Sequence, residues 1–158
     1  EHKTLLRQSV LAARKEPSSE ELLPFGKAKV VAEGSYLTVV TYGAMVMLAF
    51  DVVQKLANEG IQVELIDLRT LVPLDEALIS SSVRKTGKLL ILQEASLFAG
   101  FGAEIAARVT EKDFHYLDAP IQRLGALHIP VPYAKGLEDA MLPQKPTIEK
   151  ALRDLYAY

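Results

Sequence analysis

Short apolar runs alternate with longer amphipathic stretches through the middle of the chain. The spacing of apolar positions predicts strands at residues 37–42, 62–68 and 88–94, with helices at residues 44–59 and 75–85 between them. Strands that alternate with helices of this length are typical of crossover units in a parallel sheet. The pattern therefore predicts an α/β fold with a parallel sheet at its centre.

The flanking segments add further elements and make the expected sheet mixed. Residues 27–32 are predicted to form a strand that residues 33–35 turn back into the next one. So short a link favours an antiparallel hairpin, because a parallel return needs about a dozen residues. A helix is expected at residues 103–114, a short strand at 121–124 and an amphipathic helix at 145–158. Three prolines make the stretch before that last helix irregular.

The helix expected at residues 44–59 has two apolar stripes, whereas a helix on the surface of a domain needs only one. Its first two turns contain no polar side chain. Either the helix lies deep within its own domain, or its beginning is covered by another domain or subunit. We favour the second interpretation, which makes Met45, Val46 and Phe50 candidate interface residues.

Composition is that of a globular protein and argues against several classes of function. The 158 residues suit a single core, and 49% of them are hydrophobic. A net charge of −2 gives no basis for binding nucleic acid or an anionic membrane. The lack of cysteine excludes disulfides and thiolate chemistry. No apolar run approaches the roughly 18 residues that a membrane helix needs.

Residues 1–25 differ from the rest and are interpreted as a leader, with the folded domain at residues 26–158. The leader has a short helix-forming stretch followed by KEPSSEE, a polar break typical of a loop. The chain starts without an initiator Met and without the apolar core of a signal peptide. This start suggests that an upstream domain precedes it.

Two positions are candidates for holding a small anion, and each also has a structural explanation. Asp67 and Arg69 lie at the carboxyl end of a strand, where open α/β sheets bind ligands. An ion pair that steadies the turn is the simpler interpretation of that pair. Gly100 and Gly102 precede a predicted helix, and the free N–H groups at the start of a helix can bind an anion. However, Glu104 already supplies the negative charge that a helix N-terminus favours.

No set of residues supports catalysis, cofactor binding or metal binding. The strand before Gly43 is followed by one glycine, where a dinucleotide fingerprint needs three. His2, His115 and His128 lack the spacing of metal ligands, and the serines at 80–82 fall inside a helix and not on a nucleophile's turn. From the residues alone, an interaction or scaffolding module is favoured over an enzyme.

Five segments nonetheless resemble one enzyme family. They occur in order, without large gaps, as GKAKVVAEGSYLTVVTYGAMV, EGIQVELIDLRTLVPLD, SVRKTGKLLILQEA, GFGAEIAARV and YLDAPIQRLGALHIPVPYAKGLEDAMLP. They are similar to the carboxyl-terminal domain of the beta subunit of thiamine-diphosphate-dependent 2-oxo-acid dehydrogenases, which serve the pyruvate, branched-chain 2-oxo-acid and acetoin complexes. Transketolase shares this domain type. The resemblance implies a three-layer mixed sheet of about five strands, one antiparallel, with helices on both faces.

The resemblance also implies a role in assembly. In that family thiamine diphosphate and Mg²⁺ bind between other domains, so no catalytic, cofactor or metal residue is assigned to this chain. The implied partners are an upstream pyrimidine-binding domain, an alpha subunit or alpha part, a second beta copy and the dihydrolipoyl acyltransferase. The implied location is the cytoplasm, or the mitochondrial matrix of a eukaryote. The alternative is a free-standing α/β binding module or a transketolase-type domain, which the upstream reading frame would distinguish.

Overall fold

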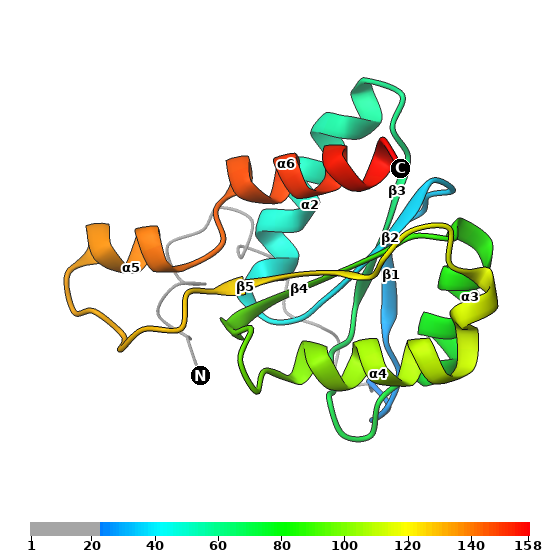
Figure 1. Ribbon diagram of the computed structural model, residues 1–158, viewed down its shortest axis with the longest axis horizontal. Coiled ribbons are helices and arrows are strands. Elements are labelled where there is room, and N and C mark those ends of the chain that lie inside the picture. Colours follow the sequence, from blue (N-terminus) through cyan, green and yellow to red (C-terminus); the bar gives the residue numbers. More distant parts are fainter. Residues whose placement is uncertain (1–22) are drawn as a thin grey trace.

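A five-stranded mixed sheet forms the middle layer of the computed structural model, which describes residues 23–158 (Figure 1). The strand order is β1-β3-β2-β4-β5, with β1 antiparallel to β3 and the other neighbours parallel. The strands are β1 (Lys29–Ala32), β2 (Leu37–Thr41), β3 (Val63–Asp67), β4 (Leu89–Ser96) and β5 (Gln122–Ala126). The α/β class and the mixed sheet predicted above are therefore confirmed.

Helices cover both faces of the sheet and complete three layers (Figure 1). Helices α2 and α6 pack on one face and α3 and α4 on the other, whereas α5 lies beyond the end of β5. The helices are α2 (Ala44–Asn58), α3 (Glu76–Thr86), α4 (Phe101–Asp113), α5 (Lys135–Met141) and α6 (Lys145–Tyr156), with a 3₁₀ turn, η2 (Phe114–Tyr116). Helix α5 falls in the stretch predicted to be irregular, between two of its prolines.

The predicted hairpin between the first two strands is wrong. β1 pairs with β3 instead, with Lys29 opposite Asp67, and β3 lies between β1 and β2. The link after β1 crosses the beginning of β3, where the amides of Ser35 and Tyr36 donate to the carbonyl of Gln62 at 3.2 and 3.1 Å. β2 is buried along its whole length and so fits the centre of a sheet, whereas the partly exposed β1 fits an edge.

Helix α2 buries most of both apolar stripes within this chain. Its buried residues pack on the sheet and in one cluster with Ile148, Leu152 and Leu155 of α6, all three of them fully buried. Ion pairs join the polar edges of the two helices: Lys145–Asp51 at 2.6 Å, Lys55–Glu149 at 2.8 Å and Arg153–Glu59 at 2.7 Å. A position deep in its own domain thus accounts for most of α2, and an interface at its beginning stays a prediction.

Helix α3 begins at a side-chain cap and ends at a glycine. Asp75 Oδ1 accepts a hydrogen bond from the amide of Leu78 at 3.3 Å, which satisfies a free N–H of the first turn. Asp75 Oδ2 also accepts from the amide of Ala28 at 3.1 Å. Gly87 ends the helix in a left-handed conformation with φ of 70°. Asp75 therefore fixes the start of β1 beside the loop that follows β3.

Candidate functional site

Asp67 and Arg69 lie at the carboxyl end of β3, where the sequence places them. Asp67 Oδ1 accepts a hydrogen bond from the backbone N–H of Arg69 at 3.0 Å. Within residues 23–158 the two side chains form no ion pair, so the backbone bond, and not a salt bridge, steadies the turn. It supports the left-handed conformation of Arg69, with φ of 57°. The exposed guanidinium side chain is left to line a groove beside α2.

This groove has a volume of about 340 Å³ and lies between β1, the end of β3 and the beginning of α2. Lys29, Asp67 and Arg69 are its charged residues, and Val46 and Phe50 belong to its apolar wall. Interface candidates on α2 and anion candidates on β3, predicted separately, therefore lie together. Sequence reasoning missed Lys29, because its place opposite Asp67 depends on β1 pairing with β3.

Gly100 and Gly102 lie in a different place and surround a buried side chain. The amide of Gly102 donates to Gln93 Oε1 at 2.6 Å, and Gln93 Nε2 donates to the carbonyl of Ser96 at 2.6 Å. A Cβ on Gly100 would lie 2.0 Å from Gln93 Nε2, so only glycine leaves room there. The loop is therefore shaped around Gln93. The Gly102 N–H already donates to Gln93 and is not free to bind an anion. The sequence signal for this role is a glutamine directly after an apolar run of four residues in β4.

The interface candidates on α2 present little surface of their own. Met45 exposes 2% of its area and Val46 8%, while Phe50 is half-buried. Core packing within this chain is therefore sufficient to explain Met45. Any contact made by the beginning of α2 would rest mainly on Phe50 and on the half-buried Met47 and Leu48 beside it.

Larger apolar side chains are exposed at the carboxyl ends of β4 and β5. Phe98 follows β4 and is 73% exposed, and Val131 follows β5 and is 77% exposed. The two loops touch, since the Phe98 and His128 rings lie 4.9 Å apart between centroids. We call this set the edge surface; it consists of Phe98, Leu127, Ile129, Val131, Tyr133 and Leu137. Its signal in the sequence is HIPVPY, where apolar residues alternate with prolines.

A buried polar cluster joins β2, β3 and α3 on the opposite face from α2. Glu64 is 2% exposed, and its carboxylate accepts hydrogen bonds from Ser82 and Lys85. Thr38 Oγ1 lies 2.7 Å from both Ser82 Oγ and Thr86 Oγ1. Burial raises the pKa of the Glu64 carboxyl, but the bonds from Lys85 and Ser82 outweigh it, so the pKa lies below its ordinary value. These groups satisfy one another and hold α3 on the sheet.

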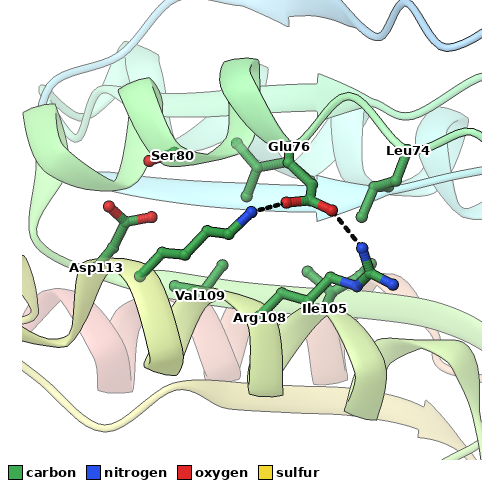
Figure 2. Close-up of a pocket in the computed structure, with 9 residues that line it drawn as sticks. Leu74, Glu76, Ser80, Ile105, Arg108, Val109 and Asp113 are labelled. Carbon is green, nitrogen blue, oxygen red and sulfur yellow. Dashed lines mark hydrogen bonds and ion pairs between the residues drawn. The ribbon is translucent and has the colours of Figure 1, made fainter.

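Figure 2 shows a small cavity where α3 meets α4. Glu76 of α3 pairs with Arg108 and Lys112 of α4 across its mouth. Hydrogen bonds from Lys112 and Arg108 hold the pKa of the Glu76 carboxyl below its ordinary value. The cavity measures about 10 Å³, which leaves room for about one water molecule. This site therefore fastens two helices and does not fit an organic ligand.

The described residues do not fit a metal-dependent cofactor. No group of three or more histidine, cysteine, aspartate or glutamate side chains within residues 23–158 could hold a metal ion. A diphosphate bound through Mg²⁺ needs carboxylates that converge on the metal, and the described residues form no such group. In the same part of the chain, no helix is long and apolar enough to cross a membrane.

The fold defines a three-layer α/β domain, and comparison places it in a family. Residues 26–148 match the family described as transketolase, C-terminal domain. The chain belongs to this family. A solved split-gene transketolase, described as an inactive beta4 tetramer, has the same fold with a TM-score of 0.75 at 23% identity, covering 91% of this chain and 46% of that one.

Curated relatives narrow the resemblance to one kind of subunit. The pyruvate dehydrogenase E1 component subunit beta of Rickettsia felis is 43% identical over 90% of this chain and 44% of its own length. The mitochondrial pyruvate dehydrogenase E1 subunit beta-1 of Arabidopsis thaliana is 44% identical over 92% of this chain and 42% of its length. The mitochondrial 2-oxoisovalerate dehydrogenase subunit beta 2 of the same plant is 41% identical over the whole chain and 43% of its length. The chain thus spans less than half of these relatives, and its predicted resemblance to such beta subunits is confirmed.

Proposed function

We propose that this chain is the carboxyl-terminal assembly domain of the beta part of a thiamine-diphosphate-dependent 2-oxo-acid dehydrogenase. The parent enzyme oxidatively decarboxylates a 2-oxo acid and passes the acyl group to a lipoyl acceptor. The observation that carries the proposal is the 43% identity to a pyruvate dehydrogenase beta subunit over 90% of this chain. A 2-oxoisovalerate dehydrogenase beta subunit matches nearly as well, at 41%. The proposal therefore extends to 2-oxo acids as a class.

In this proposal the domain organises the enzyme and takes no part in the chemistry. Thiamine diphosphate and Mg²⁺ are held by other domains of the parent enzyme. The partners are an upstream pyrimidine-binding domain, an alpha subunit or alpha part, a second beta copy and the dihydrolipoyl acyltransferase. The location is the cytoplasm or the mitochondrial matrix.

We assign contact with a second beta copy to the edge surface. Its six side chains are all apolar and more than half exposed, as in Phe98 at 73% and Ile129 at 51%. Exposed apolar groups that gather at one end of a domain mark a contact with other protein. In a two-fold contact between identical copies, the same patch of each copy meets the other. The six side chains of the edge surface carry no charge, so such a contact brings no like charges together.

Two phenylalanines provide a matched test of the edge surface. Phe98 and Phe114 are 73% and 62% exposed, and each packs against a histidine ring. Phe114 lies at the end of α4, away from the edge surface. In the full-length beta chain produced with its alpha partner, Phe98→Asp is expected to weaken association by about 2 kcal/mol, roughly thirty-fold in Kd. Phe114→Asp is expected to leave association unchanged.

Sedimentation velocity over a concentration series measures the assembly, and decarboxylation with an artificial electron acceptor measures the activity. Phe98→Asp should shift the enzyme to smaller species and lower its activity at low concentration. If it assembles like the wild type, the edge surface is not the contact. If the full-length wild-type protein has no 2-oxo-acid decarboxylase activity with thiamine diphosphate and Mg²⁺, the proposed function fails as a whole.

A further inference from the structure

The groove between β1 and α2 has the size and lining of a small-ligand site. Its volume of about 340 Å³ lies within the range of roughly 300–1,000 Å³ that ligand pockets occupy. One side is apolar, and the charged residues Lys29, Asp67 and Arg69 come from two neighbouring strands. Apolar walls with a few convergent polar groups are the usual composition of such sites.

The two cations of the groove are available to a ligand. Lys29 and Arg69 are both exposed, and neither has an ion-pair partner within residues 23–158. Asp67 contributes one negative charge beside these two positive charges. The groove therefore carries a net charge of about +1 at neutral pH, which matches a monoanion.

The beginning of α2 and the end of β2 bring further polar groups to this face of the sheet. Gly43 lines the groove at the N-terminus of this 15-residue helix, whose first turn has no acidic residue to offset the helix dipole. Thr41 is fully buried, and its hydroxyl has no hydrogen-bond partner among the described residues. Thr41 is in register with Asp67 on the adjacent strand, so both side chains point to the face that carries the groove. Polar groups without partners therefore cluster on this side.

We propose that the groove binds a small aliphatic monocarboxylate. Arg69 and Lys29 hold the carboxylate near the N–H groups of α2, and the aliphatic part lies against Val31, Met47 and Phe50. A planar guanidinium matches a carboxylate in two parallel hydrogen bonds. A phosphate dianion fits less well, because its second charge has no counterpart and Asp67 repels it. This binding is additional to the assembly role and does not depend on it.

Butyrate tests the proposal, with butyramide as the neutral control of equal shape and inorganic phosphate as the other anion. Each is titrated into the ¹⁵N-labelled 158-residue chain, and amide chemical shifts are followed by NMR. Butyrate is expected to give saturable shifts centred on Gly43, Ala44 and Arg69. Butyramide and phosphate are expected to bind at least tenfold more weakly, a difference of about 1.4 kcal/mol.

Variants at exposed positions separate the groove from a general charge effect. Arg69→Gln and Lys29→Gln are each expected to weaken butyrate binding about tenfold, whereas Lys27→Gln, exposed but outside the groove lining, should change nothing. Asp67→Asn should tighten binding, because it removes the negative charge while its amide oxygen still accepts the Arg69 N–H. A role limited to steadying the turn would not produce this gain.

Several outcomes would overturn the monocarboxylate site. Equal responses to butyrate and butyramide would show that charge is not recognised, and phosphate binding as tightly as butyrate would remove the carboxylate assignment. The absence of saturable butyrate shifts, or equal affinities for Arg69→Gln and Lys27→Gln, would remove the site itself. None of these results bears on whether the full-length enzyme assembles or decarboxylates a 2-oxo acid.

Discussion

Replacing Lys85 with methionine would remove the cation that neutralises the buried carboxylate of Glu64. Methionine keeps an unbranched apolar stem, so packing along α3 should change little. The carboxylate would remain 2% exposed and would keep its hydrogen bond from Ser82, but its charge would have no counterpart. The variant therefore isolates the electrostatic part of the buried polar cluster.

The expected loss follows from the exposure of the two partners. Breaking a buried ion pair by removing one partner costs about 3–5 kcal/mol. Here the Glu64 side chain is 3% exposed but that of Lys85 is 46% exposed, so water replaces part of the lost interaction. We expect Lys85→Met to lower the free energy of unfolding by about 2 kcal/mol, or Tm by roughly 4–8 °C in a chain of this size.

Urea unfolding at neutral pH measures the effect, with Glu64→Gln and the double variant completing a cycle. The double variant carries no stranded charge and should be more stable than Lys85→Met alone. A Lys85→Met variant as stable as the wild type would refute the reasoning, as would a double variant less stable than Lys85→Met. Either result would mean that the carboxylate does not need its cation.

The pH dependence gives a second reading of the same contact. The pKa of Glu64 is lowered in the folded protein, so its stabilisation is present above the unfolded-state pKa and is lost as pH falls through the folded-state pKa. Without Lys85, burial would raise that pKa, and Lys85→Met should lose stability as pH rises through the ordinary glutamate range. The difference between wild type and variant should therefore shrink in acid.

Four further substitutions test the packing and a helix cap. Leu152→Ala empties a fully buried position of α6 and should cost about 2–5 kcal/mol in urea unfolding; a cost below about 1 kcal/mol would contradict the tight packing of α6. Gly34→Ala places a Cβ 2.2 Å from the backbone N of Glu64 and should destabilise by at least about 3 kcal/mol, whereas Gly136→Ala meets nothing within 4 Å and should raise Tm slightly. Asp75→Ala removes the α3 cap and should cost about 1 kcal/mol by thermal unfolding, with no change of Tm as the contrary result.

Local periodicity located the strands and most helices to within two residues, but it did not give the strand order. The limits of a helix such as α3 depend on residues that adjoin it, namely Asp75 and Gly87. The position of β1 depends on β3, which follows some thirty residues later and takes the place that a hairpin would have filled. The short link between β1 and β2 predicts that these two strands pair. In the structure β2 is buried along its whole length between β3 and β4, and β1 pairs with β3.

The candidate site was predicted in separate pieces for the same reason. Asp67 and Arg69 were found because the end of a strand is visible in the sequence, whereas Lys29 joins them only through the β1–β3 register. The two apolar stripes of α2 suggested a neighbouring protein, but much of the helix is covered by the sheet and by α6, which begins at Lys145, far along the chain. The groove at the beginning of α2 also carries charged residues, which an apolar stripe does not reveal.

Because β3 lies between the first two strands of the chain, β1 forms one edge of the sheet. It has four residues and contains a break in register, and only its pairing with β3 holds it in the sheet. Lys29 belongs to this strand, so the place of one cation in the groove depends on the pairing of β1 with β3.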